Sequence, residues 1–155
     1  MKFTPLQVRE IVGISQETLR HWRKVIPELK GRNGYSPCFT AGDVLALKVI
    51  NEIVDTLQVR VQALAPLATN LFNICRGIHW PRLENQCLVI RFPETLIETC
   101  RRDNICSDEK TSAMVVVPLN QHISAIRDRL TGAENQPQCD LPFPPMAMQK
   151  QSTRH

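Results

Sequence analysis

Three groups of apolar residues recur at helical spacing within the first 60 residues, and each predicts the buried face of one helix. The apolar face of the first helix consists of Leu6, Val8, Ile11 and Val12. That of the second helix, over residues 16–25, consists of Leu19, Trp22 and Val25. That of the third helix, over residues 41–57, consists of Val44, Leu47, Ile50, Val54 and Leu57.

Residues that satisfy free backbone groups mark the ends of these helices. Thr4 and Gln7 have the spacing of a capping box at the first helix, and Ser15 can cap the second. Gly13 permits a sharp exit from the first helix, because a residue with a Cβ resists the left-handed conformation. Two helices joined by so short a link form the outline of a helix-turn-helix.

The second helix and the loop after it carry most of the positive charge. Between Ser15 and Gly34 there are five Lys or Arg and two Asp or Glu, an excess of +3 in a chain of net charge +4. Such a basic face can bind phosphates, or it can simply face water. The expected DNA contacts are Gln16, Thr18, Arg20, His21, Arg23 and Lys24 from the helix, and Lys30, Arg32, Asn33 and Tyr35 from the loop.

The order of these motifs resembles MerR-type winged helix-turn-helix regulators. Residues 12–23, Val-Gly-Ile-Ser-Gln-Glu-Thr-Leu-Arg-His-Trp-Arg, are similar to the family's turn and second helix. Residues 39–44, Phe-Thr-Ala-Gly-Asp-Val, are similar to its entry into the next helix. The resemblance implies that the basic loop between them is a wing. Pro37 stands where the family usually has an arginine, so we expect Arg32 or Lys30 to supply that phosphate contact.

Apolar residues continue at alternating three- and four-residue steps after the third helix. Pro66 is expected at a helix start or a kink, and we expect a short helix over 61–65 and a longer one over 66–76. In MerR-like proteins the helix after the DNA-binding unit pairs with its copy, so the resemblance implies a homodimer. Packing within one chain is the alternative. The expected dimer surface consists of Ala68, Leu71, Cys75 and Ile78.

The second half of the chain predicts a small module of mixed type. Residues 87–92 and 114–119 are apolar and rich in β-branched residues, and each predicts a strand. Residues 93–102 and 120–130 are expected to form helices. From about residue 132, prolines and glutamines without periodicity predict a mobile tail.

The predicted fold is mainly α, with a small α/β or α+β module. Its expected parts are a winged helix-turn-helix over 1–60, a connecting helix over 61–78, the module over 79–131 and the tail over 132–155. No apolar run is long enough for a membrane span, and the chain starts with a capped helix rather than a signal peptide. A cytoplasmic protein associated with the nucleoid is expected.

Motifs that indicate catalysis are not found in the sequence, so we expect no enzyme activity and no cofactor. The candidate catalytic residues are His79, His122, Glu94 and Glu98. Single histidines are commonly ordinary surface or core residues. Two carboxylates four residues apart are also common on a helix surface.

Four cysteines are candidates for binding a soft metal: Cys75, Cys87, Cys100 and Cys106. They lack a close pair such as Cys-x2-Cys, and we expect no metal site. Cys100 and Cys106 flank two arginines that would lower a thiol pKa, which is the basis of a redox-sensing interpretation.

The predicted function is a dimeric transcription regulator that binds double-stranded DNA in a sequence-specific way. Gln16 can bond adenine and the Thr18 methyl group can touch thymine in the major groove. The second module can bind an unknown effector or protein. The alternatives are an architectural factor for recombination or packaging, and a protein-binding adaptor.

Overall fold

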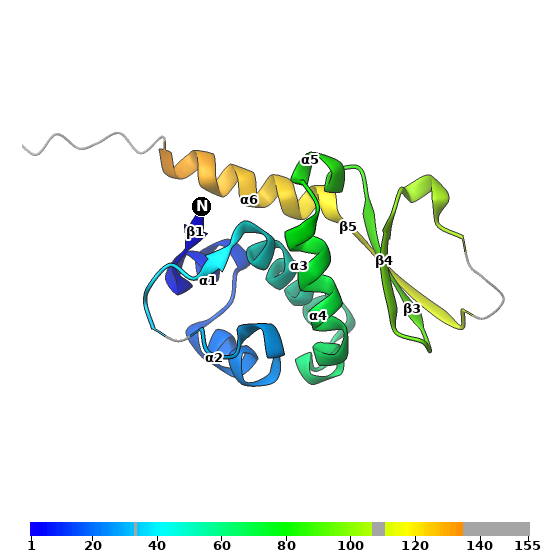
Figure 1. The fold of residues 1–155 in the computed structure, drawn as a ribbon, viewed down its shortest axis with the longest axis horizontal. Coiled ribbons are helices and arrows are strands. Elements are labelled where there is room, and N and C mark those ends of the chain that lie inside the picture. Colours follow the sequence, from blue (N-terminus) through cyan, green and yellow to red (C-terminus); the bar gives the residue numbers. More distant parts are fainter. Residues whose placement is uncertain (33, 107–110, 135–155) are drawn as a thin grey trace, which may run out of the picture.

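The computed structural model describes residues 1–32, 34–106 and 111–134 and shows a mainly helical fold with a small antiparallel sheet (Figure 1). The helices are α1 (Pro5–Val12), α2 (Gln16–Val25), α3 (Ala41–Leu57), α4 (Val61–Gly77), α5 (Trp80–Leu83) and α6 (Leu119–Glu134). Two short 3-10 helices are η1 (Pro27–Leu29) and η2 (Arg102–Asn104). The strands are β1 (Lys2–Phe3), β2 (Phe39–Thr40), β3 (Cys87–Phe92), β4 (Leu96–Cys100) and β5 (Ala113–Pro118).

The helix boundaries predicted near the N-terminus are confirmed by their caps. Thr4 and Gln7 form the capping box, in which the Gln7 backbone N–H donates to Thr4 Oγ1 at 3.3 Å and the Thr4 N–H donates to Gln7 Oε1 at 2.9 Å. Gly13 ends α1 with a φ of 86°, in the left-handed region. Ser15 Oγ then accepts the Thr18 N–H at 3.0 Å and starts α2.

The prediction that Pro66 starts a new helix is wrong. A single helix, α4, runs through it from Val61 to Gly77, and Pro66 lies on its exposed side. Proline removes one backbone hydrogen bond from the helix. The apolar face of α4, which includes Leu64 and Leu67, is buried and contacts α3, and this burial offsets the lost bond.

The prediction that this helix carries the dimer surface is also wrong, because the residues concerned are buried within one chain. Ala68, Leu71 and Cys75 are 1%, 3% and 1% exposed within the single chain, and Ile78 packs against the same core. Helix α4 contacts α3, η1, α2 and β4 of its own chain. The three- and four-residue spacing therefore marks an internal packing face, which was the alternative interpretation.

The helix expected over residues 93–102 is a strand instead. Strand β4 pairs antiparallel with β3, which pairs on its other side with β5, in the order β4-β3-β5. Thr95, with a φ of 52°, lies in the turn between β3 and β4. Glu94 and Glu98 consequently share no helix face, and Glu98 Oε1 accepts from Arg91 Nε at 2.8 Å across the strand pair.

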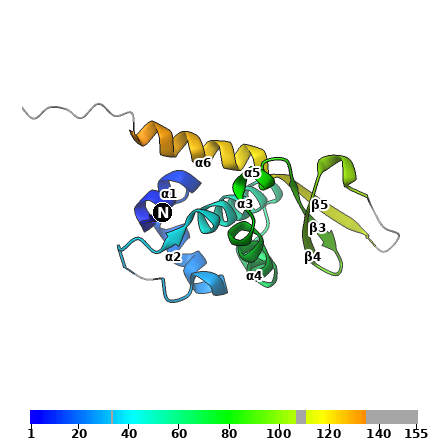
Figure 2. The same ribbon diagram turned by 45° about the horizontal axis from the view of Figure 1, so that its top comes forward.

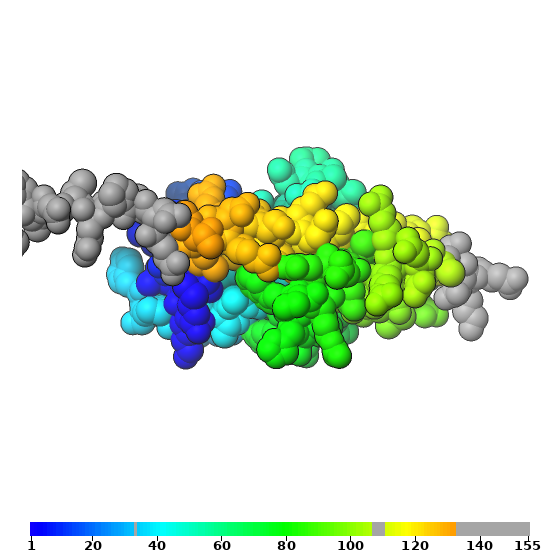
Figure 3. Space-filling model, turned by 90° about the horizontal axis from the view of Figure 1, so that it is seen from above, coloured from blue at the N-terminus to red at the C-terminus, as the bar shows by residue number. Residues whose placement is uncertain are grey.

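Helix α6 connects the sheet to the N-terminal helices. It follows β5 directly and contacts α1, α3 and α5, as Figures 1 and 2 show. In Figure 3 it forms a band along one face, from the sheet to the N-terminal residues. Arg127 of α6 forms an ion pair with Glu84, just after α5. Residues 132–134, assigned by prediction to the tail, belong to α6, and the rest of that tail lies outside the described residues.

A single core runs through both halves of the chain. The cluster of buried residues is continuous from Phe3 in β1 to Ile126 in α6. The boundary expected between residues 78 and 79 therefore does not divide this core, and the short helix α5 follows it. Within the described parts of the chain, no helix is both long and apolar enough to cross a membrane.

Candidate nucleic-acid interface

Two buried side chains fix the rotation of α2 about its axis. Leu19 is 2% exposed and Trp22 is 3% exposed, and their burial confirms the predicted inward face. Because successive helical residues are about 100° apart, the opposite face of α2 points to water. The exposed residues on it are Gln16, Glu17, Arg20, His21 and Lys24.

A groove of about 330 Å³ lies between α1, α2 and the loop that precedes β2. Three arginines, Arg9, Arg20 and Arg23, line it together with Gln16 and the exposed Tyr35. Its remaining lining residues are Pro5, Leu6, Leu19 and Gly34. Among the described residues that line this groove none is a carboxylate, so an anion is the ligand that its charge favours.

Two of the three arginines are held by neighbours. Arg9 Nη1 donates to Gln16 Oε1 at 3.5 Å, which joins α1 to the start of α2. The Arg23 guanidinium lies over the Phe39 ring, 5.8 Å from its centroid. Arg23 Nε and Nη2 are buried and have no hydrogen-bond partner among the described residues. Buried donors of this kind are usually satisfied by a ligand or by water.

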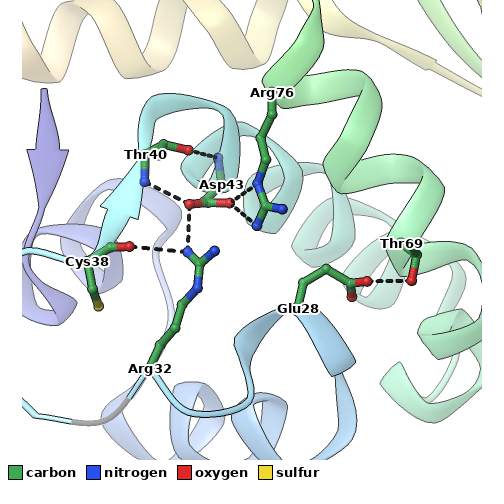
Figure 4. A network of polar contacts seen from close by, with 7 residues as sticks. All are labelled: Glu28, Arg32, Cys38, Thr40, Asp43, Thr69 and Arg76. Carbon is green, nitrogen blue, oxygen red and sulfur yellow. Dashed lines mark hydrogen bonds and ion pairs between the residues drawn. The ribbon is translucent and has the colours of Figure 1, made fainter.

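The loop that closes the groove is anchored to the core by Asp43 (Figure 4). This carboxylate is fully buried and accepts from Arg32 Nη1 at 2.6 Å and from Arg76 Nε at 2.6 Å. The Thr40 backbone N–H also donates to it at 2.7 Å, and Thr40 Oγ1 accepts the Asp43 N–H at 3.2 Å. Asp43 thus joins the loop, the start of α3 and the end of α4.

The ionisation of Asp43 is controlled by these contacts. Burial alone would raise the pKa of the carboxyl group, because a charge is costly to remove from water. The hydrogen bonds from Arg32, Thr40 and Arg76 outweigh burial and hold the pKa of Asp43 below its usual range. Asp43 is therefore a carboxylate at neutral pH and a permanent counter-ion for the two arginines.

Arg32 has a different role from the one expected for it. Its Nη1 donates to Asp43 Oδ2 and to the Cys38 carbonyl oxygen at 3.3 Å, and its side chain is 23% exposed. These contacts hold the loop against the core. They also pair the Arg32 charge with Asp43, although Arg32 was expected to contact a phosphate in place of the family's arginine at position 37. Of the two expected replacements, Lys30 is the one that is exposed.

The other expected contact residues are distributed around α2 and the loop. The Thr18 hydroxyl lies 2.8 Å from Ser15 Oγ and belongs to the helix cap. His21 faces α4, with its Nε2 3.3 Å from Gln62 Nε2. Tyr35 is 92% exposed. Asn33 lies outside the described residues.

Sequence reasoning missed three groups near this groove. Arg9 was assigned no role, although its position two turns before the basic helix could have suggested one. Glu17 was not among the expected DNA contacts, yet it lies on the exposed face of α2. Leu6 was expected in the core but is 54% exposed and lines the groove.

The candidates for catalysis and metal binding lie outside the groove. His79 is exposed beside α5, whereas His122 of α6 is 7% exposed, and burial lowers the pKa of its imidazole against an opposing effect of Glu52. Burial raises the pKa of the Cys75 thiol to about 12. Among the described residues, no group of three or more His, Cys, Asp or Glu side chains is arranged to hold a metal ion.

No known protein family matches this chain, and no curated protein matches it. Its function is therefore inferred from its own residues and their geometry.

Proposed function

We propose that the protein is a sequence-specific DNA-binding transcription regulator with a winged helix-turn-helix of the type that its sequence resembles. The observation that carries the proposal is the groove between α1 and α2 that Arg9, Arg20 and Arg23 line. Arginines bind phosphate oxygens and fix the register of a protein on a duplex, whereas side chains at base edges give specificity. Both kinds of side chain are present on one face here.

In this proposal α2 lies in the major groove of the DNA. Its N-terminal residues Gln16 and Glu17 are exposed and would face the base edges. Glutamine bonds adenine through two hydrogen bonds, and a glutamate accepts from the amino group of cytosine. Arg20 and Lys24, one turn further along, would contact the flanking phosphates.

The loop between η1 and β2 has the role of the wing. Lys30 and Tyr35 are exposed on it, so both are available to the DNA backbone. Its base is fixed to the core by the bonds of Arg32 to Asp43 and to the Cys38 carbonyl. A loop held in this way loses less conformational entropy when it binds.

A homodimer remains part of the proposal, on a surface other than the buried face of α4. A single helix-turn-helix contacts few base pairs, and two copies related by symmetry combine the binding energies of two half-sites.

Selection of binding sites from random double-stranded DNA with the full chain tests the proposal. An enriched inverted repeat supports a dimeric regulator. Multiple phased sites would instead favour an architectural factor. The absence of any enriched sequence at physiological salt contradicts sequence-specific binding and favours a protein-binding adaptor.

A further inference from the structure

Two cysteines face each other at one end of the β3–β4 pair. Cys87 begins β3, Cys100 ends β4, and the two are direct partners in the antiparallel register. Side chains of directly opposed residues lie on the same face of a sheet. Leu88 and Ile90 belong to the continuous core, whereas Cys87 and Val89 do not. The two thiols therefore share the face that points away from the helices.

The hydrogen bonds of the sheet define the spacing of this pair. The Leu119 N–H donates to the Gln86 carbonyl at 3.2 Å, so the backbone groups of Gln86 point toward the β5 side. Because these directions alternate along a strand, the groups of Cys87 point toward β4. Opposed residues of this hydrogen-bonded type have Cα atoms about 5.5 Å apart. Disulfides join Cα atoms about 4.4–6.8 Å apart, and the Cα spacing typical of such a pair falls within this range.

The two thiols differ in access to a reagent. Cys87 is 5% exposed, whereas Cys100 is half-buried. The segment after β4 is held by Arg91, whose Nη1 donates to the Cys106 carbonyl oxygen at 2.6 Å. Burial and then the Glu98 carboxylate raise the pKa of Cys100. The thiolate is therefore a small fraction at neutral pH, and this fraction increases as the pH rises.

We propose that Cys87 and Cys100 form a reversible disulfide by exchange with a low-molecular-weight disulfide such as oxidised glutathione. The Cys100 thiolate attacks one sulfur of the reagent and releases one glutathione thiolate. The Cys87 thiolate then attacks the Cys100 sulfur of the mixed disulfide and releases the second. The two protein thiols are oxidised by two electrons, oxidised glutathione is reduced, and the two thiol protons pass to the glutathione thiolates. This proposal is independent of DNA binding.

Peptide mapping of the full chain tests this assignment. The protein is equilibrated with oxidised and reduced glutathione, quenched in acid, alkylated and digested with trypsin. Cleavage after Arg82, Arg91, Arg102 and Lys110 places Cys87, Cys100 and Cys106 in three separate peptides. We expect residues 83–91 to be joined to residues 92–102, with a rate that rises with pH and with complete reversal by dithiothreitol. A Cys100–Cys106 bond, or two alkylated thiols at Cys87 and Cys100, would overturn the proposal.

Two variants separate the steps. Cys87→Ser removes the resolving thiol, so a glutathione adduct should accumulate on Cys100. Cys106→Ser is the matched control and should leave the Cys87–Cys100 bond unchanged. Loss of the Cys87–Cys100 bond in Cys106→Ser would show that Cys106 is needed to form it, which would overturn the direct exchange proposed here. Because the decisive mapping uses the unmodified protein, a folding defect in either variant does not affect it.

Discussion

Arg76, in the last turn of α4, donates a hydrogen bond from Nε to Oδ1 of Asp43 at 2.6 Å, and Asp43 lies at the start of α3. The second oxygen of the same carboxylate accepts from Arg32 in the loop. The position of that loop therefore depends on the end of α4, which in turn leads to the sheet. Asp43 therefore joins the loop to the start of α3 and to the end of α4.

Asp43→Asn should lower the free energy of unfolding by about 2–4 kcal/mol. The substitution leaves two arginines without a counter-ion, and breaking a buried ion pair costs roughly 3–5 kcal/mol. The expected loss is slightly smaller because the Arg32 and Arg76 side chains are 23% and 32% exposed. Denaturant unfolding measures it. Asp55→Asn, at an exposed position near the end of the same helix, should change stability by less than about 0.5 kcal/mol.

The contribution of Asp43 should also depend on pH in a defined direction. Its pKa in the folded protein lies below that of an unfolded aspartate, which is about 3.9. The stabilisation is therefore complete above about pH 5 and decreases as the pH falls through the folded-state pKa. The stability difference between the wild type and Asp43→Asn should shrink as the pH is lowered from 5 to 3. A constant difference would show that the charge of Asp43 is unimportant.

Gly42 allows α3 and α4 to approach closely. A Cβ at this position would lie 2.6 Å from the Cys75 carbonyl oxygen and 2.8 Å from the Arg76 Cα. Gly42→Ala should therefore destabilise the protein by about 1–3 kcal/mol, although alanine favours a helix. Gly77→Ala is the control, because nothing lies within 4 Å of its Cβ, and it should be neutral or slightly stabilising. Equal thermal stability of the two variants would contradict this packing.

Trp22→Ala should cost about 3–5 kcal/mol of unfolding free energy, because the indole is 3% exposed and its removal leaves a cavity. Tyr35→Ala, at a position 92% exposed, should have almost no effect on stability. Thermal or denaturant unfolding of both variants provides the comparison. A loss below about 1 kcal/mol for Trp22→Ala would mean that α2 is rotated about its axis.

Local signals were sufficient to predict the boundaries of the N-terminal helices. The bonds between Thr4 and Gln7, and the cap from Ser15 to Thr18, join residues three positions apart, so their residue types are enough. The rotation of α2 was equally predictable, because the polar residues around Leu19 and Trp22 leave only one apolar face.

Features that depend on distant partners were not predictable from the sequence. Leu96, Ile97 and Cys100 fit the spacing of a helix, and only pairing with β3 makes the segment a strand. The apolar spacing of α4 shows that Leu71 is buried but does not show which chain buries it. The charge of Arg32 suggested a phosphate contact. Its actual partner, Asp43, lies 11 residues away, so the local sequence did not reveal the ion pair.

The salt dependence of DNA binding offers the most direct test of the proposed interface. Arg20 is exposed on α2 and lines the groove, and it is expected to contact a phosphate. Arg20→Ala should reduce the slope of log K against log salt by about one unit, and should weaken binding to selected and unrelated duplexes alike. Arg102→Ala is the matched control, because this exposed arginine lies in η2, beyond the sheet. Its affinity and slope should equal those of the wild type. If Arg20→Ala binds as tightly as Arg102→Ala at about 0.15 M salt, the groove is not the DNA-binding surface.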